Sequence, residues 1–203
     1  MTQPVTARGA TPPPAHASSQ PSAWVQRWTH LLEREATVLD LACGYGRHTR
    51  WFAGRGHPVV SVDRSQEALD ALADLAATGQ AELHKADIEN SPWPLCEGTG
   101  LRQFGAVVVC NYLWRPLLPT ITGSLAIGGV LIYETFAEGN ASVGKPSRPD
   151  FLLSHGELLG ACSDLRVVAY EDGFCQHPPR FVQRVTAVRA PSGTLQPSRH
   201  PID

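Results

Sequence analysis

The sequence lacks several features by which whole classes of protein are recognised. It has no run of Lys and Arg residues and its formal net charge is −2, so a surface for a nucleic-acid backbone is not predicted. Its longest apolar stretches, such as AVVVC and GGVLIY, have the length of strands and are far too short to span a membrane. No basic segment followed by an apolar one marks a signal peptide at the amino terminus. We therefore expect a cytoplasmic protein that binds neither nucleic acid nor membranes.

The cysteines are few, and their spacing matches no disulfide or metal-binding motif. There are five of them, an odd number, and no CxxC pair occurs. This pattern predicts reduced thiols, because a disulfide framework or a zinc site requires paired or clustered cysteines. We expect no bound metal.

One folded domain with two tails is predicted. The chain has 203 residues, 42% of them hydrophobic and 18% charged, which is typical of a single soluble domain. Residues 1–20 and 191–203 are rich in Pro, Ser and other residues that bury little apolar surface, so we expect flexible tails there. The domain is expected to occupy residues 21–190.

Within the domain, strand-like apolar runs alternate with helical patterns, and two strand-like runs stand together at the end. This order predicts an α/β fold with a doubly wound, Rossmann-like sheet, mostly parallel, of about seven strands with an antiparallel strand near the C-terminus. The expected strands are 38–41, 59–62, 81–86, 104–110, 130–136, 165–170 and 181–189. The expected helices are 22–35, about 47–54, about a dozen residues after Ser65, 116–125 and 154–162.

The most informative segment is the Gly-rich turn at residues 42–46. An apolar run ends at Asp40, the turn Ala-Cys-Gly-Tyr-Gly follows, and a helical pattern begins directly afterwards. A strand, a tight turn and a helix start in that order form a site where a nucleotide-like ligand approaches bare backbone. A second apolar run ends at Asp63, which is placed to accept hydrogen bonds from ribose hydroxyls.

Two common nucleotide sites do not match this turn. A dinucleotide fingerprint needs a third glycine, but the bulkier Thr49 stands in its place. A Walker phosphate loop needs Gly-Lys-Ser/Thr, which is absent. A nucleotide-cofactor oxidoreductase is therefore disfavoured, although it stays open as an alternative.

The segment from Asp40 to Gly46 resembles the acid-x-Gly-x-Gly-x-Gly motif of class I S-adenosylmethionine-dependent methyltransferases, with Ala42 in place of the first glycine. Within that family, GRHTRWFAGRGHPVVSVDRS and ETFAEGN are similar to the small bacterial enzymes grouped with tellurite-resistance methyltransferases. The resemblance covers about residues 22–190.

The resemblance implies S-adenosyl-L-methionine as the cofactor. In that reading the carboxylate of Asp40 meets the ammonium group of the cofactor, Asp63 holds its ribose, and Asp87 holds the adenine amino group beside the backbone N–H of Ile88. Asn111 follows the fourth expected strand and flanks the sulfonium. The complete set of implied cofactor-binding residues is Asp40, Ala42, Cys43, Gly44, Gly46, Asp63, Arg64, Asp87, Ile88 and Asn111.

The acceptor of the methyl group is less well defined. Methyl transfer is an in-line displacement in which alignment and exclusion of water supply much of the acceleration, so a dedicated base is not required. If a base is used, Glu134 and His155 are the candidates. Arg115 either binds an anionic acceptor or pairs with a neighbouring acid. The expected acceptor-binding residues are Tyr112, Trp114, Arg115, Tyr133 and Phe136.

The acceptor is expected to be a small molecule. The Asp/Asn-Pro-Pro-Tyr/Phe signature of enzymes that methylate exocyclic amino groups is absent, because Asn111 is followed by Tyr-Leu-Trp. Only the polar loop at residues 137–150 is available as an insertion for recognising the acceptor. A noncatalytic module that binds the cofactor or its demethylated product stays open, and the oligomeric state is not defined by the sequence.

Overall fold

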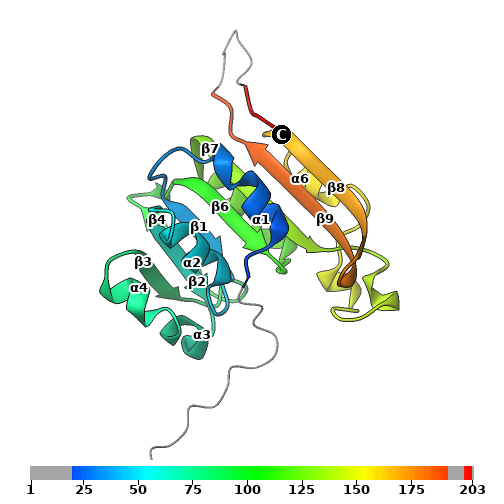
Figure 1. Cartoon of the computed structure of the whole chain (residues 1–203), viewed down its shortest axis with the longest axis horizontal. Helices are drawn as coiled ribbons and strands as arrows, with labels where there is room; N and C mark the ends of the chain where they lie inside the picture. The colour runs from blue at the N-terminus through cyan, green and yellow to red at the C-terminus, as the bar shows by residue number, and fades with distance from the viewer. Residues whose placement is uncertain (1–19, 192–198, 203) are drawn as a thin grey trace, which may run out of the picture.

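The computed structural model of the protein describes residues 20–191 and 199–202. These residues form a seven-stranded sheet in the order β3-β2-β1-β6-β7-β9-β8, with helices on both faces (Figure 1). The sheet strands are β1 Val38–Leu41, β2 Val59–Asp63, β3 Ala81–Lys85, β6 Phe104–Cys110, β7 Leu125–Phe136, β8 Arg166–Gln176 and β9 Pro179–Val188. A separate two-stranded hairpin consists of β4 Cys96–Glu97 and β5 Gly100–Leu101.

The pairing of the strands confirms the predicted fold class. Strands β3, β2, β1, β6 and β7 are parallel neighbours, whereas β9 is antiparallel to β7 and β8 is antiparallel to β9. Since parallel strands share their direction, the carboxyl ends of the five parallel strands meet at one edge of the sheet. That edge is where the segments singled out in the sequence come together.

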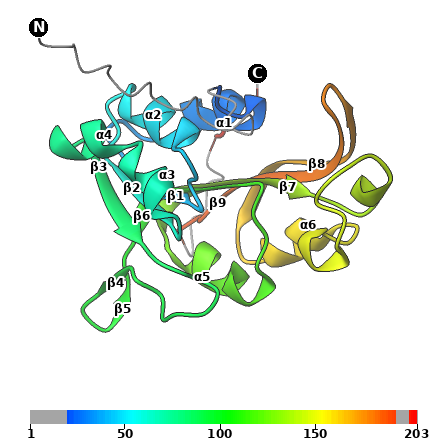
Figure 2. The same cartoon turned by 90° about the horizontal axis from the view of Figure 1, so that it is seen from below.

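The helices form a layer on each face of the sheet. Figure 2 shows α1 and α2 with α3 and α4 on one face, and α5 and α6 on the other. Their bounds are α1 Ala23–Trp28, α2 Arg47–Ala53, α3 Gln66–Asp70, α4 Ala73–Ala77, α5 Leu118–Gly123 and α6 Glu157–Ala161. Short 3₁₀ segments at Thr29–Leu31, Arg115–Leu117, Asn140–Ser142 and Pro149–Phe151 complete the helical structure.

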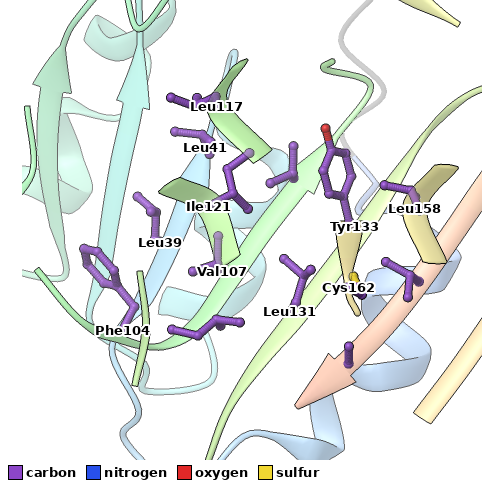
Figure 3. Packing of buried hydrophobic residues seen from close by; sticks show 14 of the residues in the cluster. Leu39, Leu41, Phe104, Val107, Leu117, Ile121, Leu131, Tyr133, Leu158 and Cys162 are labelled. Atoms are coloured by element: carbon purple, nitrogen blue, oxygen red, sulfur yellow. The ribbon is translucent and has the colours of Figure 1, made fainter. Parts of the chain in front are cut away.

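The hydrophobic core is divided in two by the sheet. Alternate residues of each central strand point to opposite faces, and both faces are covered, which explains why the strands read as unbroken apolar runs. On the face of α5 and α6, Leu39 and Val107 pack with Ile121 and Leu158 (Figure 3). The cluster on the α1 and α2 face contains Trp24, Val25, Trp28, Val38, Phe52, Ala53, Val59, Ala106, Val108, Cys110, Val130, Ile132 and Val188.

Several predicted boundaries differ from the structure. The first helix ends at Trp28 and continues only as a 3₁₀ turn, and the helix after Ser65 is divided into α3 and α4. The last two strands are longer than predicted and pair from Arg166↔Val188 to Gln176↔Pro179. Gly173, beyond the predicted end of its strand, therefore lies within β8, because cross-strand pairing overrides its low strand propensity.

The predicted tails are largely outside the described residues, which exclude 1–19, 192–198 and 203. At the described C-terminal end, the carbonyl oxygen of Pro201 lies 3.1 Å from Nε2 of His30. Over residues 20–191 and 199–202, no helix has both the length and the apolar character needed to cross a membrane.

Candidate functional site

The turn after β1 is built from residues in the left-handed conformation. Ala42, Gly44 and Gly46 have φ values of 53°, 54° and 75°. At Gly46 a side chain is excluded for a second reason, because an added Cβ would lie 2.3 Å from Cδ2 of Leu72. The Cβ of Ala42 makes the left-handed conformation costly at that position. The backbone is therefore strained at Ala42, which replaces the first glycine of the motif.

Asp63 is fixed at the end of β2 by two backbone donors. The N–H of Gly44 donates to Oδ2 at 2.8 Å, and the N–H of Ser65 donates to Oδ1 at 2.9 Å. Each carboxylate oxygen keeps a further lone pair for another donor. The geometry therefore suits a ligand that presents two neighbouring hydroxyl groups, as ribose does.

Asp87 presents a second fixed carboxylate. Its Oδ1 accepts from the N–H groups of Glu89 and Asn90 at 3.2 and 3.3 Å, and Nδ2 of Asn90 donates to Oδ2 at 3.0 Å. The hydrogen bond from Asn90 lowers the pKa of Asp87, so the group is an ionised acceptor. The N–H of Ile88 has no partner among the described residues. An acceptor beside a free donor suits an amino-substituted heterocycle such as adenine.

A cavity of about 360 Å³ lies at the carboxyl ends of the parallel strands. It spans the junction of β1 and β6, where the strand order reverses and where ligands bind in doubly wound sheets. The residues that line it are Ala42, Asp63, Arg64, Ala86, Asp87, Ile88, Glu89, Asn111, Tyr112, Leu113, Thr135, Phe136, Pro146 and Phe151.

The turn that follows β6, at Asn111 and Tyr112, is the exit turn of this strand, and β7 holds it against the cavity. Asn111 has a φ of 57°, and its N–H donates to the carbonyl of Glu134 at 2.9 Å. The hydroxyl of Tyr133 donates to the carbonyl of Tyr112 at 2.9 Å. Burial, and then the negative charge of Glu89, raise the pKa of Tyr112, so its hydroxyl stays protonated near neutral pH.

Eight of the predicted site residues meet at the cavity. They are Ala42, Asp63, Arg64, Asp87, Ile88, Asn111, Tyr112 and Phe136. Cys43, Gly44 and Gly46 shape the adjoining turn without lining the cavity. Their contact with a cofactor stays a prediction.

Asp40 lies behind the turn and does not line the cavity. Its side chain is 1% exposed and accepts a hydrogen bond from the hydroxyl of Thr49 at 2.7 Å. Burial raises the pKa of Asp40 to about 6. The hydroxyl of Thr49, which stands where a dinucleotide fingerprint would have its third glycine, thus satisfies the buried acid. Direct contact between Asp40 and an ammonium group stays a prediction.

The two candidate bases are engaged elsewhere. Glu134 is fully buried, accepts a hydrogen bond from the hydroxyl of Ser22 at 3.0 Å and forms an ion pair with Arg184. His155 has a side chain that is 91% exposed and lies 2.7 Å from a carboxylate oxygen of Asp172. Neither residue lines the cavity. The structure therefore does not bring either base to the place where an acceptor would lie.

Three predicted acceptor-binding residues also lie outside the cavity lining. Tyr133 is buried in the core, and its hydroxyl reaches the exit turn of β6 but not the cavity. Trp114 packs against the core as a partly buried residue. Of the two alternatives for Arg115, the structure has the ion pair, with Glu157 at 2.7 Å.

Sequence reasoning missed part of the cavity wall. Thr135 and Leu113 directly adjoin predicted residues and could be found from the strand ends. Pro146 and Phe151 come from the polar loop and its end, where no periodic pattern indicates which side chains face inward. Their position depends on the tertiary fold.

Comparisons with known proteins find methyltransferases. A family model described as a methyltransferase domain matches residues 38–126. The malonyl-[acyl-carrier protein] O-methyltransferase of Salmonella typhimurium is 31% identical over 141 residues, which cover 66% of this chain and 52% of that protein. The chain thus spans about half the length of this curated relative.

Solved structures share the fold. TehB from Haemophilus influenzae superposes with a TM-score of 0.59 and 19% identity, covering 76% of this chain and 57% of that one. The glycopeptide N-methyltransferase MtfA in complex with S-adenosyl-L-homocysteine superposes with a TM-score of 0.56 and 19% identity, covering 81% and 87%. Residues 38–126 thus match a methyltransferase-domain family model, and the chain shares its fold with solved S-adenosylmethionine-dependent methyltransferases.

Proposed function

We propose that the protein transfers the methyl group of S-adenosyl-L-methionine to a small-molecule acceptor by in-line displacement. The observation that carries the proposal is a single cavity with two chemically different ends. One end has the fixed carboxylates of Asp63 and Asp87. The other has an apolar wall formed by Leu113, Phe136, Pro146 and Phe151.

The residues of the polar end would hold the cofactor. Asp63 would accept hydrogen bonds from the ribose hydroxyls, and Asp87 would accept one from the adenine amino group while the N–H of Ile88 donates to the ring. Asn111 and Ala42 would lie along the remainder of the cofactor. The bound cofactor supplies an electrophilic methyl group on a positively charged sulfur.

The residues of the apolar end would align the acceptor and exclude water. Alignment of this kind accounts for a large share of the barrier reduction in a displacement reaction. The nucleophilic atom forms the new bond to the methyl carbon while the carbon–sulfur bond breaks. The electron pair of the breaking bond stays on sulfur. An acceptor that carries a proton on the nucleophilic atom would release it to solvent before it enters the water-excluding end, since neither Glu134 nor His155 lines the cavity.

The charge of the cavity supports an acceptor without a carboxylate. Among the described residues that line it, the cation is Arg64, which adjoins Asp63, while Asp87 and Glu89 add negative charge. One relative is named as a malonyl-[acyl-carrier protein] O-methyltransferase. Among the described lining residues, Arg64 alone could pair with a carboxylate, and it adjoins Asp63, so we do not extend that substrate to this chain.

Calorimetric titration of the protein with S-adenosyl-L-methionine and with NADH tests the cofactor. We expect saturable binding of the first alone, and binding of NADH alone would refute the proposal. The Asp63→Ala variant should bind the cofactor at least about tenfold more weakly, because a carboxylate–hydroxyl hydrogen bond contributes about 1.5–3 kcal/mol. Asp70→Ala is the matched control, since this exposed acid bonds to Gln66 away from the cavity.

Catalysis is tested by measuring S-adenosyl-L-homocysteine formation over a panel of thiols, phenols, amines and chalcogen oxyanions. We expect turnover of at least one small acceptor by the wild-type protein. Tight cofactor binding with no turnover on any panel member would favour the noncatalytic binding module instead.

A further inference from the structure

Arg115 clamps the chain on both sides of Phe151. Its Nε and Nη2 atoms donate to the two carboxylate oxygens of Glu157 at 2.7 and 2.9 Å. Its Nη1 atom donates to the carbonyl of Asp150 at 2.9 Å, and Nη2 also donates to the carbonyl of Leu152 at 2.8 Å. Four of the five N–H donors of the guanidinium are thus used. This group has little capacity left for a ligand.

The clamp fixes the backbone that carries Phe151. Residue 151 lies between the two carbonyls that Arg115 holds, and its own N–H donates to the carbonyl of Arg148 at 3.0 Å. Two residues further on, Leu153 is fully buried, and its N–H donates to the carbonyl of Phe136 at 3.0 Å. The position of Phe151 is therefore set before any ligand binds.

The side chain of Phe151 lines the cavity although 38% of its surface is exposed. Next to it in the wall are Phe136 and Pro146. The carbonyl of Pro146 is held by the side chain of Asn140 at 3.0 Å. A fixed, partly exposed aromatic ring in a cavity wall is a surface that a bound ligand would remove from water.

We propose that Phe151 is a specificity-determining residue that selects acceptors with a planar apolar ring, and that Arg115 is the positioning residue that holds it. This inference rests on the proposed function. An acceptor ring packed against Phe151 gains contact at little entropic cost, because the clamp has already ordered the wall. Arg115 acts through this wall and does not touch the acceptor.

The test compares two thiols that share a nucleophile but differ in the ring. Protein saturated with S-adenosyl-L-homocysteine, which cannot react, is titrated by calorimetry with benzyl mercaptan and with 2-mercaptoethanol. We expect benzyl mercaptan to bind about tenfold more tightly, which is the upper range for one aromatic pair. Equal affinities, or no binding of benzyl mercaptan, would overturn the inference.

Two variants test which residues cause the preference for benzyl mercaptan over 2-mercaptoethanol. Phe151→Ala should remove most of the affinity ratio between the two thiols, whereas Phe174→Ala, which removes a ring that is 48% exposed and lies outside the cavity lining, should leave the ratio unchanged. Arg115→Lys keeps the charge but loses the planar fork, so the ratio should fall about threefold or more. An unchanged ratio in Phe151→Ala contradicts the role of the ring, and an unchanged ratio in Arg115→Lys contradicts the clamp.

The affinity for S-adenosyl-L-homocysteine distinguishes a failure of the inference about Phe151 from a failure of the proposed function. It should stay within about twofold of wild type in both Phe151→Ala and Arg115→Lys, because neither side chain lies at the polar end of the cavity. A general loss of structure would weaken the binding of this ligand as well and would not change the ratio between the thiols. If the wild-type protein does not bind it at all, the proposed function itself is wrong.

Discussion

Asp40 and His48 should give the folded protein two opposite pH dependences. Burial raises the pKa of Asp40 from 3.8 to about 6 and lowers the pKa of His48 from 6.5 to about 3. Both side chains are nearly inaccessible, at 1% and 3% exposure. The stability associated with Asp40 is full below pH 3.8 and is lost as the pH rises through about 6. The stability associated with His48 is full above pH 6.5 and is lost as the pH falls toward 3.

The magnitudes follow from these values. Between pH 5 and 7, protonation of Asp40 changes the free energy of unfolding by about 1 kcal/mol, with the higher stability at pH 5. Over the same range, His48 changes it by about 2 kcal/mol in the opposite direction. The two effects partly offset each other in the wild-type protein. Each should therefore become visible when the other group is replaced by one that does not titrate.

Urea denaturation of Asp40→Asn and His48→Gln at pH 5, 6 and 7 measures both effects. Asparagine can still accept from the hydroxyl of Thr49, and glutamine supplies an acceptor for the N–H of Ser22, which donates to Nε2 of His48 at 3.2 Å. Relative to wild type, Asp40→Asn should gain about 1 kcal/mol of stability between pH 5 and 7. His48→Gln should lose about 2 kcal/mol relative to wild type over that range.

A difference between Asp40→Asn and wild type that does not change with pH would refute this reasoning, because it would mean that Asp40 titrates as an exposed acid does. The same variant decides whether Asp40 meets the cofactor. Direct contact with the ammonium group predicts at least about a tenfold loss of affinity for S-adenosyl-L-methionine at pH 8. A loss below about threefold would assign Asp40 to support of the turn through Thr49.

Two further predictions concern the turn after β1 and the exit turn of β6. Gly46→Ala should unfold at a denaturant concentration well below that of Gly44→Ala, since both add about 1–2 kcal/mol of left-handed strain but only the first collides with Leu72. Equal midpoints would contradict the clash. Tyr133→Phe should cost about 1 kcal/mol of stability and lower kcat several-fold with little change in cofactor affinity, because the carbonyl of Tyr112 loses its donor at 2.9 Å. An unchanged kcat for any acceptor that turns over would show that this hydrogen bond does not position the exit turn.

The sequence by itself determined the class of fold and the polar end of the cavity. Apolar runs alternating with helical patterns require a sheet buried on both faces, and each run ends in a residue that the parallel geometry brings to one edge. Asp63 and Asp87 could be predicted because Asp63 ends β2 and Asp87 comes shortly after the end of β3. The turn at Gly46 could be predicted because few residues other than glycine adopt its backbone conformation.

Only the tertiary structure decided which polar side chains face the cavity. Glu134 adjoins the cavity residue Thr135 in sequence, but successive residues of a strand point to opposite faces, so its carboxylate reaches Arg184 and Ser22 instead. Arg115 meets Glu157 across 42 residues of sequence. Contacts of this separation depend on how the chain returns to the sheet, which no local pattern encodes. For the same reason, the place of Phe151 in the cavity wall depends on how the loop folds against the strand ends.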